Sequence, residues 1–160
     1  MNQFDLKNRT ALITGGAQGF GFDIAKKFLN SGANVIIWDI DEKELQNAVK
    51  KINNSKLSYN VVDVSNFEKI NQTVLEINKK TNIDILINNA GITGPTAELW
   101  NYSINDWNKV IEINLNGTFN CCKAVVPNMI ENNYGRIVNI ASVAGKDGNA
   151  NASAYSSSKA

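Results

Sequence analysis

Short apolar runs alternate with longer stretches of helical periodicity along the chain, and this alternation predicts the secondary structure. Five runs that are apolar along their length predict buried strands, over residues 10–13, 34–38, 57–62, 83–87 and 137–140. Helical spacing predicts helices over about 20–30, 41–51, 65–80 and 104–132, and the start of another over 152–160. Pro127 lies inside the longest of these and predicts a kink or break there.

Some helix ends carry signals of their own. Gly32 follows the first helix at the position where a left-handed glycine commonly ends a helix. Asp41 can cap the second helix, and Glu44, three residues later, completes the pattern of a capping box. Ser65 or Asn66 can cap the third helix.

The order of these elements predicts an α/β fold. Strands that are apolar along their length and separated by helices form a parallel sheet covered on both faces. Right-handed crossovers then give a doubly wound parallel sheet, the Rossmann fold, with five strands present. No internal repeat or linker interrupts the pattern, so residues 1–160 are expected to form one domain.

Composition and charge exclude several classes of function. The formal net charge is +1, and without a basic patch neither a nucleic acid nor an anionic membrane is expected as a partner. The longest apolar runs are four to six residues, and the first residues lack a signal-peptide layout. Cys121 and Cys122 are neighbours and poorly placed for a disulfide, which favours a reducing, cytoplasmic location. The chain has no histidine, so no His-based triad and no metal site are expected.

A glycine-rich segment connects the first strand to the first helix. It reads Thr14-Gly15-Gly16-Ala17-Gln18-Gly19-Phe20-Gly21. Glycines allow a tight turn and a close approach of the backbone to a pyrophosphate, and the helix N-terminus offers free N–H groups and a positive dipole end. We therefore expect Gly15, Gln18, Gly19, Phe20 and Gly21 to bind a dinucleotide, although such a turn can also serve backbone geometry alone.

Acidic residues end the next two strands. Asp39 can accept hydrogen bonds from the adenosine ribose hydroxyls, and its charge would repel a 2′-phosphate. No Lys or Arg occurs in the glycine-rich turn or directly after Asp39, so NAD is favoured over NADP. Asp63 and Val64 end the third strand at the same sheet edge, where an adenine would rest. The alternatives are that Asp39 caps a helix or is solvated, and that Asp63 lies in a solvated loop.

Five motifs stand in one order along the chain. They are Thr14-Gly15-x-x-x-Gly19-x-Gly21, Asn88-Asn89-Ala90-Gly91, Asn114, Ser142 and Tyr155-x-x-x-Lys159. In this order and spacing the chain resembles the short-chain dehydrogenase/reductase family, from about Leu6 to Ala160. The resemblance implies that Asn89, Ala90 and Gly91 line the cofactor site and that their turn steadies the central sheet.

The resemblance also implies the roles of four catalytic residues. Tyr155 would exchange a proton with the substrate's carbonyl or hydroxyl oxygen, and Ser142 would orient that oxygen. Lys159 would hold the nicotinamide ribose, and Asn114 would hold a water that links Lys159 to solvent. The residue types agree with this chemistry, because Tyr155 and Lys159 share one helix face and an ammonium group favours a nearby phenolate. The sequence holds 26 asparagines, so an incidental Asn114 is the alternative.

The activity implied by the resemblance is hydride transfer between NAD(H) and a ketone or secondary alcohol. Two substrate branches stay open, the 3-oxoacyl-carrier-protein reductases and the dehydrogenases of sugars or sugar acids; Asp39 disfavours the first, which commonly uses NADP. A non-catalytic NAD-binding module, or an inactive fragment, is the alternative. The family also implies a homo-oligomer, a dimer or tetramer. Because Ala160 directly follows Lys159, we expect the chain to be the N-terminal portion of such an enzyme, without the C-terminal strands of its sheet.

Overall fold

The computed structural model describes residues 4–160 and contains one sheet of five parallel strands. The strands are β1 (Thr10–Thr14), β2 (Asn34–Asp39), β3 (Leu57–Val61), β4 (Ile85–Asn88) and β5 (Arg136–Asn139). Their order in the sheet is β3-β2-β1-β4-β5, so the chain winds outward from β1 first in one direction and then in the other. The expected doubly wound α/β fold is confirmed.

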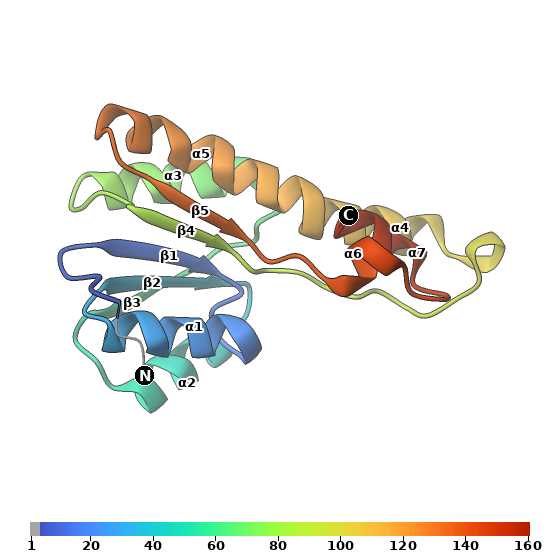
Figure 1. The fold of residues 1–160 in the computed structure, drawn as a ribbon, viewed down its shortest axis with the longest axis horizontal. Coiled ribbons are helices and arrows are strands. Elements are labelled where there is room, and N and C mark those ends of the chain that lie inside the picture. The colour runs from blue at the N-terminus through green and yellow to red at the C-terminus, as the bar shows by residue number, and fades with distance from the viewer. Residues whose placement is uncertain (1–3) are drawn as a thin grey trace.

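Helices cover both faces of the sheet (Figure 1). One face carries α1 (Gly19–Asn30) and α2 (Glu42–Ile52), and the other carries α3 (Phe67–Asn78) and α5 (Gly117–Glu131). Beyond the carboxyl ends of β4 and β5 lie α4 (Ile104–Ile111), α6 (Val143–Asp147) and α7 (Ser153–Ser158). A 3₁₀ turn, η1 (Leu99–Asn101), precedes α4, and a π-helical turn, η2 (Glu112–Asn116), joins α4 to α5.

Successive residues of the central strands point to opposite faces, and each face has its own core. Ile13 packs with the α1 and α2 layer, whereas its neighbour Leu12 packs with α3 and α5. Both are fully buried, and so is Trp38 of β2 on the second face. Because β1 is enclosed on both faces and both edges, its position is defined by packing in every direction, and its carboxyl end is a fixed reference for the site.

The predicted caps at the helix ends are confirmed, but the capping box is not completed, because Asp41 N donates to Asp39 Oδ1 and not to the Glu44 side chain. The Asp41 side chain accepts a hydrogen bond from Glu44 N, and Gly32 has the expected positive φ, of 94°, directly after α1. Asn66 rather than Ser65 caps α3, by accepting from Lys69 N. The strand bounds agree with the predicted ones to within two residues.

Two features differ from the sequence-based expectation. Of the kink or break predicted at Pro127, the break is wrong, because α5 continues through Pro127 to Glu131. Val125 and Met129, on either side of that residue, are buried, and this packing holds the helix in spite of the missing N–H. The irregularity lies earlier, at the π-helical turn η2. The short helix α6, which has a Gly inside it, was not predicted.

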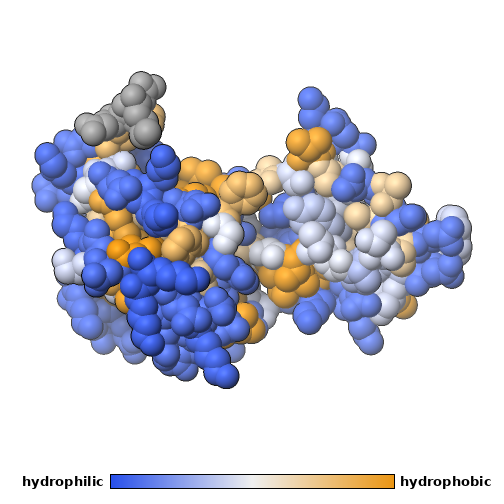
Figure 2. Space-filling view, turned by 90° about the horizontal axis from the view of Figure 1, so that it is seen from below, coloured by the Kyte–Doolittle hydropathy of each residue, from blue (hydrophilic) through white to orange (hydrophobic). Residues whose placement is uncertain are grey.

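The molecule narrows between the sheet and the segments beyond its carboxyl edge. Figure 2, seen from the side of α1 and α2, shows a waist with apolar residues gathered on both sides of it. β5 is an edge strand, and its Ile137 and Val138 are 41% and 47% exposed. Within residues 4–160, no helix has the length and apolar character needed to cross a membrane.

The Thr14 hydroxyl joins the end of β1 to the segment that follows β4. It accepts hydrogen bonds from Asn89 N and Ala90 N, each at 3.0 Å, and it donates to Ile87 O at 3.4 Å. Thr14 is 2% exposed, so water cannot replace these bonds. Two backbone N–H groups therefore depend on one buried side chain.

Replacing this hydroxyl should be costly. We expect Thr14→Val to lower the free energy of unfolding by about 2 to 4 kcal/mol, because the shape is kept while the partly buried N–H groups of Asn89 and Ala90 lose their acceptor. Urea denaturation followed by circular dichroism measures the effect. Thr73→Val is the matched control, since the equally buried Thr73 hydroxyl only donates to the helical carbonyl of Lys69. Equal losses of unfolding free energy in the two variants would contradict the inference that the two N–H groups depend on Thr14.

Candidate active site

The glycine-rich turn approaches the rest of the site so closely that side chains are excluded. Gly15 has φ +62°, and a Cβ there would lie 2.9 Å from Ala90 Cα. A Cβ on Gly21 would collide with the Gly15 carbonyl oxygen. The first hydrogen bond across this turn into α1 runs from Phe22 N to Gln18 O, so the N–H groups before it have no helical acceptor. The turn thus presents open backbone donors at a helix N-terminus.

Asp39 stands beside this turn at the end of β2. Its Oδ2 accepts from Ala17 N at 3.3 Å, and its Oδ1 accepts from Ile40 N and Asp41 N. The alternative that Asp39 caps α2 is wrong, because Asp41 does so. The carboxylate is therefore held by main-chain donors at the carboxyl edge of the sheet, and its charge faces the same side as the open amides.

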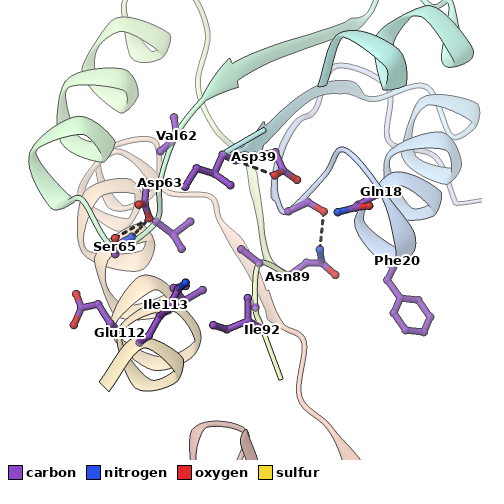
Figure 3. A pocket seen from close by; sticks show the side chains of 16 residues that line it. Gln18, Phe20, Asp39, Val62, Asp63, Ser65, Asn89, Ile92, Glu112 and Ile113 are labelled. Atoms are coloured by element: carbon purple, nitrogen blue, oxygen red, sulfur yellow. Dashed lines mark hydrogen bonds between the residues drawn. The ribbon is translucent and has the colours of Figure 1, made fainter. Parts of the chain in front are cut away.

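A cavity of about 570 Å³ extends from the turn along the carboxyl edge of the sheet (Figure 3). Nine of the predicted cofactor residues line it: Gly15, Gln18, Phe20, Asp39, Asp63, Val64, Asn89, Ala90 and Gly91. Four others, Gly19, Gly21, Tyr155 and Lys159, lie outside its lining. Phe20 stands at the open rim, where its side chain is 79% exposed and points away from Asn89.

Sequence reasoning did not identify one wall of this cavity. It is formed by Ile92, Lys109, Glu112 and Ile113, and the edge near Asp63 also includes Ile40, Val62 and Ser65. Lys109, Glu112 and Ile113 have the i, i+3, i+4 spacing of one helix face. That spacing is also the pattern of a helix packed on a core, so it did not distinguish a cavity wall from a buried face.

Polar residues at the ends of β3 and β4 are held in place by short hydrogen bonds. Asp63 Oδ1 accepts from Ser65 N at 2.9 Å and from Ser65 Oγ at 2.7 Å, so this carboxylate has a fixed orientation. Asn89 Nδ2 donates to the carbonyl oxygens of Thr14 and Gly15, at 2.9 and 3.0 Å. Asn88 is buried beside β5 and donates to Asn139 Oδ1. The bonds of Asn88 and Asn89 agree with the structural function expected for the turn after β4.

Lys159 and Asn114 both lie beside Gly91, which lines the cavity. Lys159 Nζ donates to Ile140 O at 2.8 Å. A Cβ on Gly91 would lie 3.5 Å from that ammonium nitrogen and 3.1 Å from Asn114 Oδ1. Gly91 itself lines the cavity, so one glycine is in contact with both the cavity and this pair. The structure thus brings Lys159, Asn114 and the cavity together from three distant parts of the chain.

The other two predicted catalytic residues occupy neighbouring short helices. Ser142 precedes α6, and its hydroxyl accepts from Ala144 N at 3.2 Å, which makes it the N-cap of that helix. Tyr155 lies half-buried on α7, one helical turn before Lys159. In the part of the chain that the structure describes, no hydrogen bond joins the Ser142 and Tyr155 side chains. α6 and α7 pack against each other, so both residues belong to one region.

Burial changes the acid–base properties of two groups. Desolvation lowers the pKa of Lys159 from its ordinary value, because a half-buried ammonium loses hydration. Burial, together with the neighbouring Cys122, raises the pKa of Cys121 to about 12. The Cys121 thiol therefore stays protonated and packs in the core between α5 and the sheet.

The chain belongs to the short-chain dehydrogenase family, whose model matches residues 9–160. It is 44% identical to 2-dehydro-3-deoxy-L-rhamnonate dehydrogenase (NAD(+)) of Sphingomonas sp. (strain SKA58), over 95% of this chain and 61% of that protein. It is 39% identical to a 3-oxoacyl-acyl-carrier-protein reductase of Chlamydia muridarum (strain MoPn / Nigg), over 97% of this chain and 64% of that protein. The chain thus spans about three fifths of the length of these curated relatives.

A solved structure of the same fold supports this assignment. The crystal structure of NAD⁺-bound xylitol dehydrogenase superposes with a TM-score of 0.92 at 34% sequence identity. The match covers 96% of this chain and 60% of that chain. The family resemblance inferred from the five motifs is confirmed by these matches.

The lowered pKa of Lys159 predicts a pH-dependent stability. Above the folded-state pKa and below the ordinary value of 10.5, the unfolded chain binds more protons, so stability should rise with pH in that window. Lys159→Met has no such ammonium group to desolvate. We therefore expect wild type to gain stability relative to Lys159→Met as the pH rises toward 10.5, measured by urea denaturation at a series of pH values.

The control for this experiment is Lys146→Met, at an exposed position of α6. It corrects for the general effect of removing one lysine from the chain. Stability curves of wild type and Lys159→Met that stay parallel across the window, after this correction, would contradict the assigned burial of the ammonium group.

Proposed function

We propose that the protein is an NAD-dependent oxidoreductase that transfers a hydride between NAD(H) and a ketone or secondary alcohol. The observation that carries this proposal is the position of Gly91. It lines the cavity that begins at the glycine-rich turn, and it lies against Lys159 and Asn114. A dinucleotide that fills the cavity would therefore end at the residues predicted to act on the substrate.

The residues of the cavity fit a dinucleotide. The absent side chains at Gly15 and Gly21 leave the backbone free to meet a pyrophosphate, and the open amides at the start of α1 supply donors for it. Asp39 is placed to accept from ribose hydroxyls, and Asp63, held by Ser65, to accept from an adenine amine. Gln18, Gly19 and Phe20 belong to the same turn. When bound, NAD would supply the hydride acceptor or donor.

The chain's own residues would then move and hold the proton. We assign to Tyr155 the proton exchange with the substrate oxygen, and to Ser142 the orientation of that oxygen. Lys159 would favour the phenolate form of Tyr155 through its charge and would bind the nicotinamide ribose. Its ammonium has a defined position because the Ile140 carbonyl accepts from it. Asn114 would hold a water near Lys159 through the second lone pair of its Oδ1, within a site whose lining residues Asn89 and Ala90 are hydrogen-bonded to β1.

The substrate branch we favour is a sugar or sugar acid. Asp39 is oriented by three main-chain N–H groups at the point where a 2′-phosphate would enter, which supports NAD rather than NADP. The name of the relative with 44% identity describes an NAD(+)-dependent dehydrogenase of a sugar acid. A 3-oxoacyl-carrier-protein reductase is the second candidate, because a relative of that name is 39% identical. A non-catalytic NAD-binding module is disfavoured, since Ser142, Tyr155 and Lys159 are all present.

We also propose a location, a class of partner and an oligomeric state for the whole protein. It acts in the cytoplasm on a small molecule, without a nucleic-acid or membrane partner, as a homo-oligomer of two or four copies. The outward apolar side chains of Leu115 and Phe119, 51% and 61% exposed at i and i+4, support self-association through the α4–α5 side. Residues 1–160 form its dinucleotide-binding domain.

Cofactor preference is the first test. In the full-length protein NADH should bind at least ~10-fold tighter than NADPH, or ~1.4 kcal/mol, because Asp39 repels a 2′-phosphate. Side-by-side fluorescence titrations measure both dissociation constants. Asp39→Ala should narrow the ratio, and Asp41→Ala, which removes a nearby charge at the cap of α2, is the matched control. Equal affinities of the wild type for the two cofactors would overturn the choice of NAD.

The second test addresses the chemical step. Tyr155→Phe in the full-length enzyme should lower kcat by ~10²-fold or more, because only the phenolic oxygen can exchange the proton. NADH oxidation with a panel of ketones, including 3-oxoacyl thioesters and keto sugar acids, measures turnover and substrate class together. NADH affinity should stay within about twofold of wild type. A Phe variant with most of its turnover would move the proton transfer to another group.

A further inference from the structure

The amide of Asn114 is occupied by hydrogen bonds to two other segments. Its Oδ1 accepts from Ile92 N at 2.8 Å, and its Nδ2 donates to Ile92 O at 2.9 Å and to Ser158 Oγ at 2.8 Å. Because Ile92 N can only donate, the orientation of the amide is defined. Both amide hydrogens are thus used, and the side chain is 3% exposed. Asn114 therefore joins the segment after β4 to α7.

Ser158 is the partner that α7 contributes. Its hydroxyl accepts from Asn114 Nδ2, so its single hydrogen is free to donate, and it donates to Tyr155 O at 2.8 Å. Ser158 is 7% exposed, whereas its neighbour Ser157 is exposed. One buried hydroxyl therefore connects Asn114 to the backbone of Tyr155 and stands directly before Lys159.

The helix that carries Tyr155 needs such an external contact. α7 has six residues and no side-chain cap at Ala152, and a helix of that length is unstable without tertiary support. The hydrogen bond from Asn149 N to Ser156 Oγ holds its first turn, but at an exposed position. The C-terminal end of α7 is held by two hydrogen bonds, the buried one between Asn114 and Ser158 and the one between Lys159 and Ile140. Losing the first would leave the ammonium on a less constrained helix end.

We propose that Ser158 is a positioning residue, which through Asn114 sets the placement of α7 and thereby aligns Tyr155 and Lys159 with the cavity. The proposal rests on the proposed oxidoreductase function. Ser158 is not one of the residues that line the cavity, and its hydroxyl bonds to Asn114 Nδ2 and Tyr155 O; it acts through the backbone that carries the two catalytic side chains. Its loss should consequently affect the proton step more than the binding of the cofactor.

The test compares Ser158→Ala with Ser157→Ala in the full-length protein. Ser158→Ala should lower kcat about 3- to 10-fold, the range that one lost hydrogen bond corresponds to. For alcohol oxidation with NAD⁺, in which Tyr155 acts as the base, the midpoint of the acidic limb of the kcat–pH profile should rise by about half a pH unit or more, since a loosely held ammonium stabilises the phenolate less. NADH affinity should stay within about twofold of wild type. Ser157→Ala should match wild type in every measurement.

The pH profile separates positioning from general destabilisation. A smaller folded fraction lowers kcat but does not move the midpoint of the limb. The charged residues on the elements packed against α7 are the same in all variants, namely Asp106 and Lys109 of α4, Glu112 of η2, and Lys146 and Asp147 of α6. A shift in the midpoint of the acidic limb therefore indicates a change in the placement of α7.

Each outcome decides the proposal. An active wild type with an unchanged Ser158→Ala profile overturns this inference and leaves the proposed function standing. A wild type without turnover on any ketone or alcohol of the panel, although it binds NADH, overturns both. If Ser158→Ala does not fold, Ser158→Cys keeps the shape and replaces the hydroxyl by a weak hydrogen-bonding group. A shifted midpoint in that variant supports the inference, and a wild-type profile overturns it.

Discussion

The site depends above all on the close approach of the turn after β1 to the segment after β4. The Thr14 hydroxyl and the Asn89 amide form hydrogen bonds across this approach in both directions, and Gly15 leaves no side chain between the two backbones. Parallel strands place their carboxyl ends at one edge, but they do not by themselves bring two loops into contact. These bonds do so, and they join the glycine-rich turn to the segment that carries Gly91.

The part of the site that α6 and α7 carry has less support from its own secondary structure. α6 and α7 are short: α6 is capped locally by Ser142, whereas α7 depends on Asn114, which reaches it from the π-helical turn η2. A π-helical turn changes which residues of a helix share a face, and such turns are frequent at functional sites. Here the π-helical turn contains Asn114. Its side chain bonds to Ile92, in the segment after β4, and to Ser158 of α7.

Most of the fold was predictable because its signals are local. Apolar runs gave the strands, and the caps at Asp41 and Gly32 follow from backbone geometry that a few residues specify. Pro127 does not break α5, because the rule for proline describes an isolated helix, whereas the buried residues Val125 and Met129 hold this one. α6 was missed because five residues with an internal Gly145 carry no helical periodicity.

By itself the sequence determined the fold class, the family and the identities of the candidate site residues, because motif spacing and apolar periodicity are properties of the chain. Tertiary structure decided which of those residues meet. It placed Lys109, Glu112 and Ile113 on the cavity wall, gave Lys159 its carbonyl partner, and selected Ser158 from a run of three serines as the buried one. The physical reason is that burial and hydrogen-bond partners arise between segments tens of residues apart, and no local pattern encodes the distance between them.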